Sequence, residues 1–228
     1  WAMGPLSVQD ENSTIYVGEG WKAVLGDRGT VKLIKGKEEA KTKSVEIEAA
    51  QLELFTNRYL SLVEEMGSLL ERSAFSTNVK ERLDFSCALL DTEGFLIANA
   101  PHIPVHLGAL GVCVRSVRET IDLGPGDIVV TNHPRFGGSH LPDITLIASA
   151  FSEDGQRIGY IANRAHHAEL GGIAPGSMPP RARSLVEEGV VIEPMYLARE
   201  GSVDREPIRS ALTRAPFPTR NLQENLSD

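Results

Sequence analysis

The sequence is poor in the features that mark secreted, membrane-spanning or nucleic-acid-binding proteins. Its 228 residues include two cysteines, 6% aromatic residues and a net charge of −8. That negative charge argues against nucleic acid or an anionic membrane as a partner, because both are polyanions. No stretch approaches the roughly 20 consecutive apolar residues of a membrane span, and the first residues do not resemble a signal peptide. We therefore expect a soluble globular protein.

The two cysteines lie in apolar surroundings. Cys87 is flanked by Phe-Ser and Ala-Leu, and Cys113 lies between two valines. These contexts favour buried thiols over a disulfide, which fits the reducing cytosol. We expect a cytoplasmic protein in which Cys87 is not a nucleophile, since a buried thiol resists ionisation.

Common phosphate-binding and hydrolase motifs are also missing. Gly137-Gly138-Ser139 lacks the lysine and the spacing of a P-loop, and no G-x-G-x-x-G follows a predicted strand. There is no G-x-S-x-G, the nucleophile motif of many serine hydrolases. We expect this chain alone to have no ATP site.

The hydrophobic pattern divides the chain into three parts. Alternating residues predict a small β unit over residues 1–36, with strands at 13–17, 21–25 and 30–34. A charged segment rich in lysine and glutamate predicts a linker over residues 37–50. Both ends of the sequence look like cuts within a longer protein, and residues 51–228 are expected to form part of a mixed α/β domain.

Within residues 51–228, helical and strand patterns are mixed without a regular repeat, so the fold class is expected to be α+β. Apolar residues at three- and four-residue steps predict a helix from Leu52 to Leu69 whose stripe faces a core. A second helix is predicted around Leu110–Ile121, ending at Gly124-Pro125-Gly126. Strands are predicted at 85–90, 95–98, 128–131, 144–151 and 158–162, the first two joined by a hairpin turn at 91–94.

All six histidines fall in four short polar clusters. In one of them, Gly137-Gly138 precedes His140, and Pro142 precedes Asp143. A loop shaped by glycine and stiffened by proline can present an imidazole and a carboxylate to one cation. The alternative is a loop histidine that simply hydrogen-bonds to the nearby aspartate.

Two further clusters could complete such a site. His166 and His167 follow a predicted strand, so their side chains should point to opposite faces, one towards a shared metal and the other towards a second surface such as a substrate pocket. The alternative is a capped strand end. Glu81 and Asp84 offer two more carboxylates, or alternatively a surface ion pair with Arg82 and a turn cap.

Four long motifs give the sequence a family resemblance. They resemble the hydantoinase B family, which includes N-methylhydantoinase, acetone carboxylase and the C-terminal half of 5-oxoprolinase. Residues 1–36 resemble the last segment of the partner hydantoinase A half, so the chain looks like an A–B junction. One departure is Glu169, where the family more often has aspartate. The motifs are NVKERLDFSCA at 78–88, NAPHIPVHLG at 99–108, NHPRFGGSHLPD at 132–143 and HHAELGGIAPGSMPP at 166–180.

The resemblance implies an ATP-dependent enzyme that opens a cyclic amide, in the closest pattern 5-oxo-L-proline to L-glutamate, a step of glutathione metabolism. ATP and Mg²⁺ would act in the A half, and a divalent metal of unknown identity would assist hydrolysis in the B half. By matching motif, the implied metal ligands are His140, Asp143, His166 and Glu81, with Asp84 as an alternative fourth ligand. Asp84 and His167 are the implied catalytic residues.

Other readings remain open at this point. The substrate could be a hydantoin, or residues 1–228 could be a structural or assembly piece without activity of its own. The expected partners are a small cyclic amide, the hydantoinase A-like half of the same polypeptide and a second copy of the protein in a homo-oligomer. Neither nucleic acid nor membrane is expected.

Overall fold

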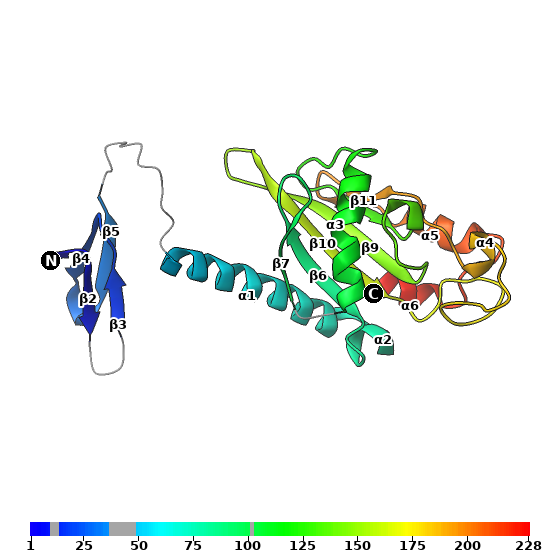
Figure 1. Ribbon diagram of the computed structural model, residues 1–228, viewed down its shortest axis with the longest axis horizontal. Helices are drawn as coiled ribbons and strands as arrows, with labels where there is room; N and C mark the ends of the chain where they lie inside the picture. Colours follow the sequence, from blue (N-terminus) through cyan, green and yellow to red (C-terminus); the bar gives the residue numbers. More distant parts are fainter. Residues whose placement is uncertain (10–13, 37–48, 101–102) are drawn as a thin grey trace. The chain divides into compact units, whose positions relative to one another are not determined.

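The computed structural model describes residues 1–9, 14–36, 49–100 and 103–228. The chain divides into two compact units, Trp1–Glu48 and Ala49–Asp228 (Figure 1). Most of the predicted linker, residues 37–48, lies outside the described residues. Its last two residues, 49 and 50, open the first long helix instead.

The first unit consists of short antiparallel strands. Strands β1, β4 and β5 form one sheet in that order, and β2 and β3 form a second. The three predicted strands are present as β3, β4 and β5, whereas β1 and β2 were not predicted. Among the described residues of this unit, Val17 and Ala23 are the buried apolar ones. The strands are β1 (Ala2–Met3), β2 (Leu6–Gln9), β3 (Thr14–Val17), β4 (Trp21–Leu25) and β5 (Val31–Lys35), and a 3-10 turn covers Asp27–Gly29.

The second unit is built on a seven-stranded sheet in the order β12-β11-β8-β9-β10-β6-β7, in which every neighbouring pair is antiparallel. The strands are β6 (Phe85–Leu90), β7 (Leu96–Asn99), β8 (Ile128–Thr131), β9 (Asp143–Phe151), β10 (Arg157–His166), β11 (Met195–Arg199) and β12 (Ser202–Val203). The helices are α1 (Ala49–Ser73), α2 (Thr77–Lys80), α3 (Pro104–Arg118), α4 (Leu185–Glu188), α5 (Glu206–Arg214) and α6 (Leu222–Ser227), with a 3-10 turn at Pro134–Phe136.

Helix α3 covers one face of this sheet (Figure 1). Its residues Leu110, Val114 and Val117 pack against sheet residues such as Ile147 and Ala162 in the main hydrophobic cluster. Residues at alternate positions of a strand point to the same face, so Asp143, Thr145 and Ile147 of β9 all lie on the α3 side. This face is the one that carries the polar residues described below.

The opposite face is covered by three other helices. The last turns of α1 contribute Met66 and Leu70, which pack near Phe85, Cys87 and Ala165. Helices α5 and α6 pack their apolar residues over the other half of the sheet, near Val130 and Ile144. The two faces thus have separate cores, and a residue's position along its strand decides which one it joins. The mixed architecture confirms the predicted α+β class.

The predicted strands of this sheet are all present, but two predictions about the helices are wrong. The stripe of α1 expected to face a core is largely exposed, with Leu52, Phe55 and Leu69 at least half accessible. Of the predicted stripe, Met66 does pack on the sheet, together with Val63, because only the C-terminal part of α1 reaches β6 and β7. Helix α3 also ends six residues before Gly124, at Arg118.

The expectation about the cysteines is confirmed in the described residues. Cys87 and Cys113 are both buried and form no disulfide. Burial raises the pKa of the Cys87 thiol to about 12, so this thiol stays protonated at neutral pH. Among the helices that the structure describes, none has the length and apolar character needed to cross a membrane.

Candidate metal centre

The ends of β9 and β10 bring two predicted site residues together. Asp143 is the first residue of β9, His166 is the last residue of β10, and the two are direct cross-strand partners. Direct partners in an antiparallel pair share a face of the sheet. The pairing therefore joins residues that are 23 positions apart in the sequence.

His140 joins them from the loop that leads into β9. Gly137 has φ 82°, and a Cβ there would lie 2.7 Å from the Cys113 nitrogen of α3. At Gly138 a Cβ would lie 2.3 Å from the Asn132 carbonyl oxygen. Both positions therefore require glycine, which explains the glycine pair that the sequence suggested would shape this loop.

The side chain of Arg164 holds the same loop through hydrogen bonds. This fully buried side chain of β10 donates from Nη1 to Ser139 Oγ at 2.9 Å, from Nη2 to the Gly137 carbonyl at 2.9 Å and from Nε to Thr145 Oγ1 at 2.8 Å. Two of these donors hold the loop immediately before His140, through the Gly137 carbonyl and the Ser139 hydroxyl, so the imidazole starts from a defined backbone position.

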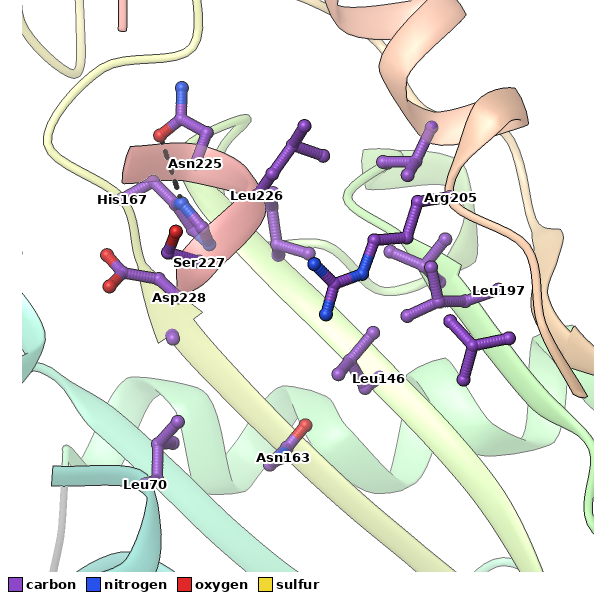
Figure 2. A pocket seen from close by; sticks show the side chains of 15 residues that line it. Leu70, Leu146, Asn163, His167, Leu197, Arg205, Asn225, Leu226, Ser227 and Asp228 are labelled. Carbon is purple, nitrogen blue, oxygen red and sulfur yellow. Dashed lines mark hydrogen bonds between the residues drawn. The ribbon is translucent and has the colours of Figure 1, made fainter. Parts of the chain in front are cut away.

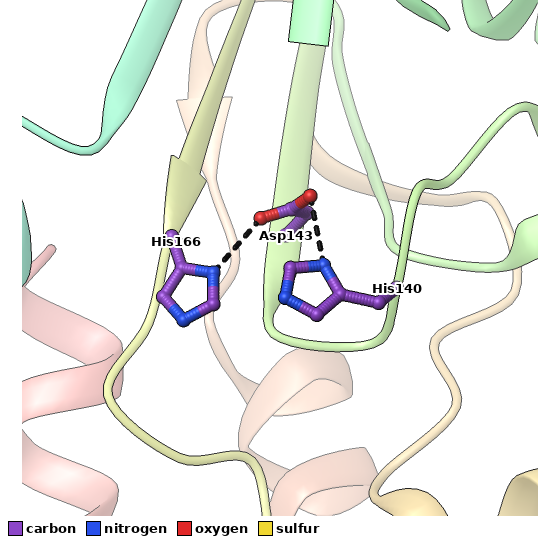
Figure 3. Close-up of side chains that lie close together, drawn as sticks. All are labelled: His140, Asp143 and His166. Atoms are coloured by element: carbon purple, nitrogen blue, oxygen red, sulfur yellow. Dashed lines mark hydrogen bonds and ion pairs between the residues drawn. The ribbon is translucent and has the colours of Figure 1, made fainter. Parts of the chain in front are cut away.

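The three side chains converge on the carboxylate of Asp143 (Figure 3). His140 Nδ1 lies 2.9 Å from Oδ2, and His166 Nδ1 lies 3.2 Å from Oδ1. The two imidazole rings are 4.7 Å apart between centroids. One ligand atom from each residue lies within 4.8 Å of the others, so the three are close enough to share one cation.

Asp143 is a buried carboxylate surrounded by three histidine side chains. Burial by itself would raise its pKa, but the imidazoles of His106, His140 and His166 beside its two oxygens outweigh burial and hold the pKa far below the usual range. Oδ2 nevertheless accepts no hydrogen bond of regular geometry from the described residues, although His140 Nδ1 is only 2.9 Å away. A buried carboxylate oxygen without a well-aligned donor is a position where a cation would fit.

His106 is a fourth member of this neighbourhood that the sequence did not single out. It lies in the first turn of α3 and is buried, with Nε2 3.3 Å from Asp143 Oδ2. Its Nδ1 lies 3.3 Å from Ser86 Oγ. The motif at 99–108 carried this histidine, but nothing local linked it to Asp143. The other histidine of that motif, His102, lies outside the described residues.

The two upstream carboxylates occupy different positions. Glu81 caps the C-terminus of α2, is exposed and does not belong to the cluster. Asp84 is half-buried immediately before β6, and its carbonyl accepts a hydrogen bond from the His166 N–H at 2.9 Å. Because Ala165 and Phe85 are cross-strand partners, Asp84 lies beside His166 in the next position of the ladder.

His167 lies apart from the cluster, on the other side of the strand end. It lines a cavity of about 270 Å³ on the face opposite α3, together with Asn163, Arg205 and mainly apolar residues (Figure 2). Its Nδ1 lies 3.1 Å from Asn225 Oδ1. Burial lowers the pKa of His167 and favours the neutral imidazole. Since an amide oxygen can only accept, Nδ1 carries the proton and Nε2 keeps a lone pair.

The last residues of the chain hold the loop that follows His167. Glu169 Oε1 accepts from the N–H groups of Arg220, at 2.7 Å, and Asn221, at 3.0 Å, and Oε2 accepts from the Gly171 N–H at 2.8 Å. Burial raises the pKa of Glu169, but these bonds and the bond from the Thr219 hydroxyl outweigh it and lower the pKa. Glu169 thus anchors this loop to residues 220 and 221. An aspartate at this position has a side chain that is shorter by one methylene and would reach these N–H groups less well.

Comparison with known proteins accounts for the long motifs. The family model for hydantoinase B/oxoprolinase matches residues 48–228. The chain belongs to this family. Over 241 aligned residues, the chain is 43% identical to 5-oxoprolinase 1 from Arabidopsis thaliana. The alignment covers 99% of the chain and 19% of that protein, so the chain spans about a fifth of the length of this relative.

Two solved structures share the fold of this hydantoinase B chain. The nucleotide-free structure of acetone carboxylase matches with a TM-score of 0.68 at 20% identity, covering 73% of this chain and 22% of the other. The ATP-dependent caprolactamase from Pseudomonas jessenii matches with a TM-score of 0.66 at 24% identity, covering 80% of this chain and 32% of the other. At these identities the likeness concerns the fold alone.

Proposed function

We propose that this chain is the metal-holding part of an ATP-dependent enzyme that opens 5-oxo-L-proline to L-glutamate. The observation that carries the proposal is the 43% identity to a 5-oxoprolinase across nearly the whole chain. The cluster of His140, Asp143 and His166 is the place in this chain where a metal could assist the reaction.

A divalent first-row metal suits the donors of this cluster. Two imidazoles and one carboxylate leave coordination positions open for water or substrate, as catalytic sites require. The buried Asp143 Oδ2, which accepts no well-aligned hydrogen bond, supports the same assignment. When bound, such a metal would polarise the substrate carbonyl or lower the pKa of a bound water.

Asp84 is the better candidate for a fourth ligand. It lies next to His166 in the strand ladder, and strand alternation puts it on the same face as Ser86, beneath α3. Leu83, just before it, has φ 54°, a left-handed conformation that is unfavourable for a bulky side chain. Glu81 is exposed on α2, which favours Asp84 over it.

The lactam has to be activated before water can open it, because amides are poor electrophiles. In the proposed sequence, ATP phosphorylates the amide oxygen in a hydantoinase A-like part of the protein, outside residues 1–228. Water then adds to the activated carbon near the cluster, and the products are glutamate, ADP and phosphate. The absence of phosphate-binding motifs from this chain agrees with that division of labour.

His167 has a separate role in this proposal. Its imidazole is neutral, and Asn225 fixes the tautomer, so Nε2 can accept a proton in the cavity. The cavity and the cluster lie on opposite faces of the sheet. His167 would therefore act on a substrate group that extends past the end of β10 into the cavity. The sequence-based prediction that His167 is catalytic enters the proposal in this form.

The test is substrate consumption by the full-length protein. The purified protein is offered 5-oxoproline or hydantoin with Mg-ATP, and glutamate, ADP and remaining substrate are measured with and without a chelator selective for transition metals. The proposal predicts glutamate formation coupled to ADP and lost with the metal. Consumption of hydantoin alone would indicate a hydantoinase, and turnover of neither substrate would favour a structural role.

A further inference from the structure

His106 has two differently bonded ring nitrogens, an arrangement that the family comparison and the proposed ligand set leave unexplained. The side chain is 2% exposed, in the first turn of α3. Nδ1 lies 3.3 Å from Ser86 Oγ, and Nε2 lies 3.3 Å from Asp143 Oδ2. Ser86 is itself fully buried on β6. Ser86, His106 and Asp143 thus form a series of side-chain contacts that runs from β6 to the cluster.

The chemistry of the two partners determines which ring nitrogen of His106 donates and which accepts. An ionised carboxylate can only accept, so the Nε2 that faces Asp143 carries the proton. In the neutral ring Nδ1 then has a lone pair, which can accept from the Ser86 hydroxyl. Because Ser86 is closed off from solvent, the arrangement cannot work as a serine nucleophile with a histidine base. Its effect is on the orientation of the Asp143 carboxylate.

We propose that His106 is a positioning residue for Asp143, with Ser86 setting the ring's orientation and tautomer. The inference rests on the proposed metal site. The carboxylate of Asp143 has imidazoles near both oxygens, and the buried His106 ring, with Nε2 3.3 Å from Oδ2, restricts its rotation and so selects one orientation for the cation. Outer partners of this kind commonly change metal affinity by about 10- to 100-fold when removed.

Two substitutions separate the two contacts of the ring. Glutamine can place its amide nitrogen near the position of Nε2, so His106→Gln keeps a donor towards Asp143. Asparagine reaches only to the position of Nδ1, so His106→Asn keeps a partner for Ser86 and loses Asp143. The two variants differ by one methylene, which makes each the control for the other. Ser86→Ala removes only the hydroxyl that orients the ring.

The measurement is Co²⁺ binding to the full-length protein, titrated against a competing chelator, with the visible absorption spectrum recorded at saturation. We expect His106→Asn to bind about 10- to 100-fold more weakly with a changed spectrum, and His106→Gln to stay within about threefold of wild type. Ser86→Ala should lose affinity by a smaller factor. Melting of the metal-free proteins shows whether each variant folds, and Ser86→Ala carries the test if His106→Asn does not.

Two results would overturn the inference. Wild-type affinity and spectrum in both His106→Asn and Ser86→Ala would show that the contact does not position Asp143. Equal losses in His106→Asn and His106→Gln would show that the ring matters for packing alone. A wild-type protein that binds no Co²⁺, like the His140→Ala control, would instead overturn the proposed metal site, and with it the role of His106.

Discussion

Arg164 offers a quantitative test of how the metal loop is held. Its guanidinium is fully buried and donates to three neutral groups: Thr145 Oγ1, Ser139 Oγ and the Gly137 carbonyl. Arg164→Met keeps much of the aliphatic volume and removes every donor. Each acceptor left unsatisfied in a buried site costs about 1–3 kcal/mol, and removal of a buried charge offsets part of that sum. We expect a net loss of about 3 kcal/mol in the free energy of unfolding.

Urea denaturation in the presence of a chelator measures this loss without a contribution from bound metal. The matched control is Arg118→Met, because Arg118 donates to the Thr92 carbonyl at 2.9 Å from a more exposed position. That variant should lose less than about 1 kcal/mol. Equal losses in the two variants, or a loss below about 1 kcal/mol for Arg164→Met, would refute the idea that Arg164 anchors the loop.

Three further predictions follow from the surroundings of single residues. The pKa of the Cys87 thiol is raised to about 12, so this thiol should resist iodoacetamide at pH 8 in the native state, and rapid native labelling would contradict this. Its contribution to the free energy of unfolding should disappear as the pH rises from 9 towards 12, because the thiol of the unfolded chain ionises first. His167→Ala should retain more bound metal than His166→Ala by elemental analysis, because only His166 contacts Asp143; equal retention would count against the assignment. Glu169→Gln should destabilise the protein near neutral pH, and its difference from wild type in urea denaturation should shrink as the pH falls below 4.5 through the lowered pKa; a constant difference would contradict the argument.

The strands were the most predictable part of the fold. Alternation of apolar residues and glycine-containing turns are local signals, and they located β4, β6 and β8 with correct bounds. The orientation of α1 could not be predicted, because its apolar residues occupy more than one face and only contact with β6 and β7 decides which face is buried. The end of α3 was misplaced because residues 119–123, which form turn and loop, separate Arg118 from the glycine-rich turn.

The candidate site was partly visible in the sequence. The glycine pair and the His-x-x-Asp spacing indicated a shaped loop around His140, and strand alternation separated His166 from His167. The meeting of His166 with Asp143 depends on the register of β9 against β10, which no local pattern reveals. His106 was missed for the same reason, since it reaches Asp143 from α3, an element placed only by tertiary packing.

The most direct test of the account is the metal content of the full-length protein and two of its variants. Wild type, His140→Ala and His166→Ala are purified side by side, and transition metals are measured by mass spectrometry together with glutamate formation from 5-oxoproline and ATP. The account predicts about one equivalent of metal in wild type and loss of both metal and activity in each variant. Full metal stoichiometry in both variants would contradict it.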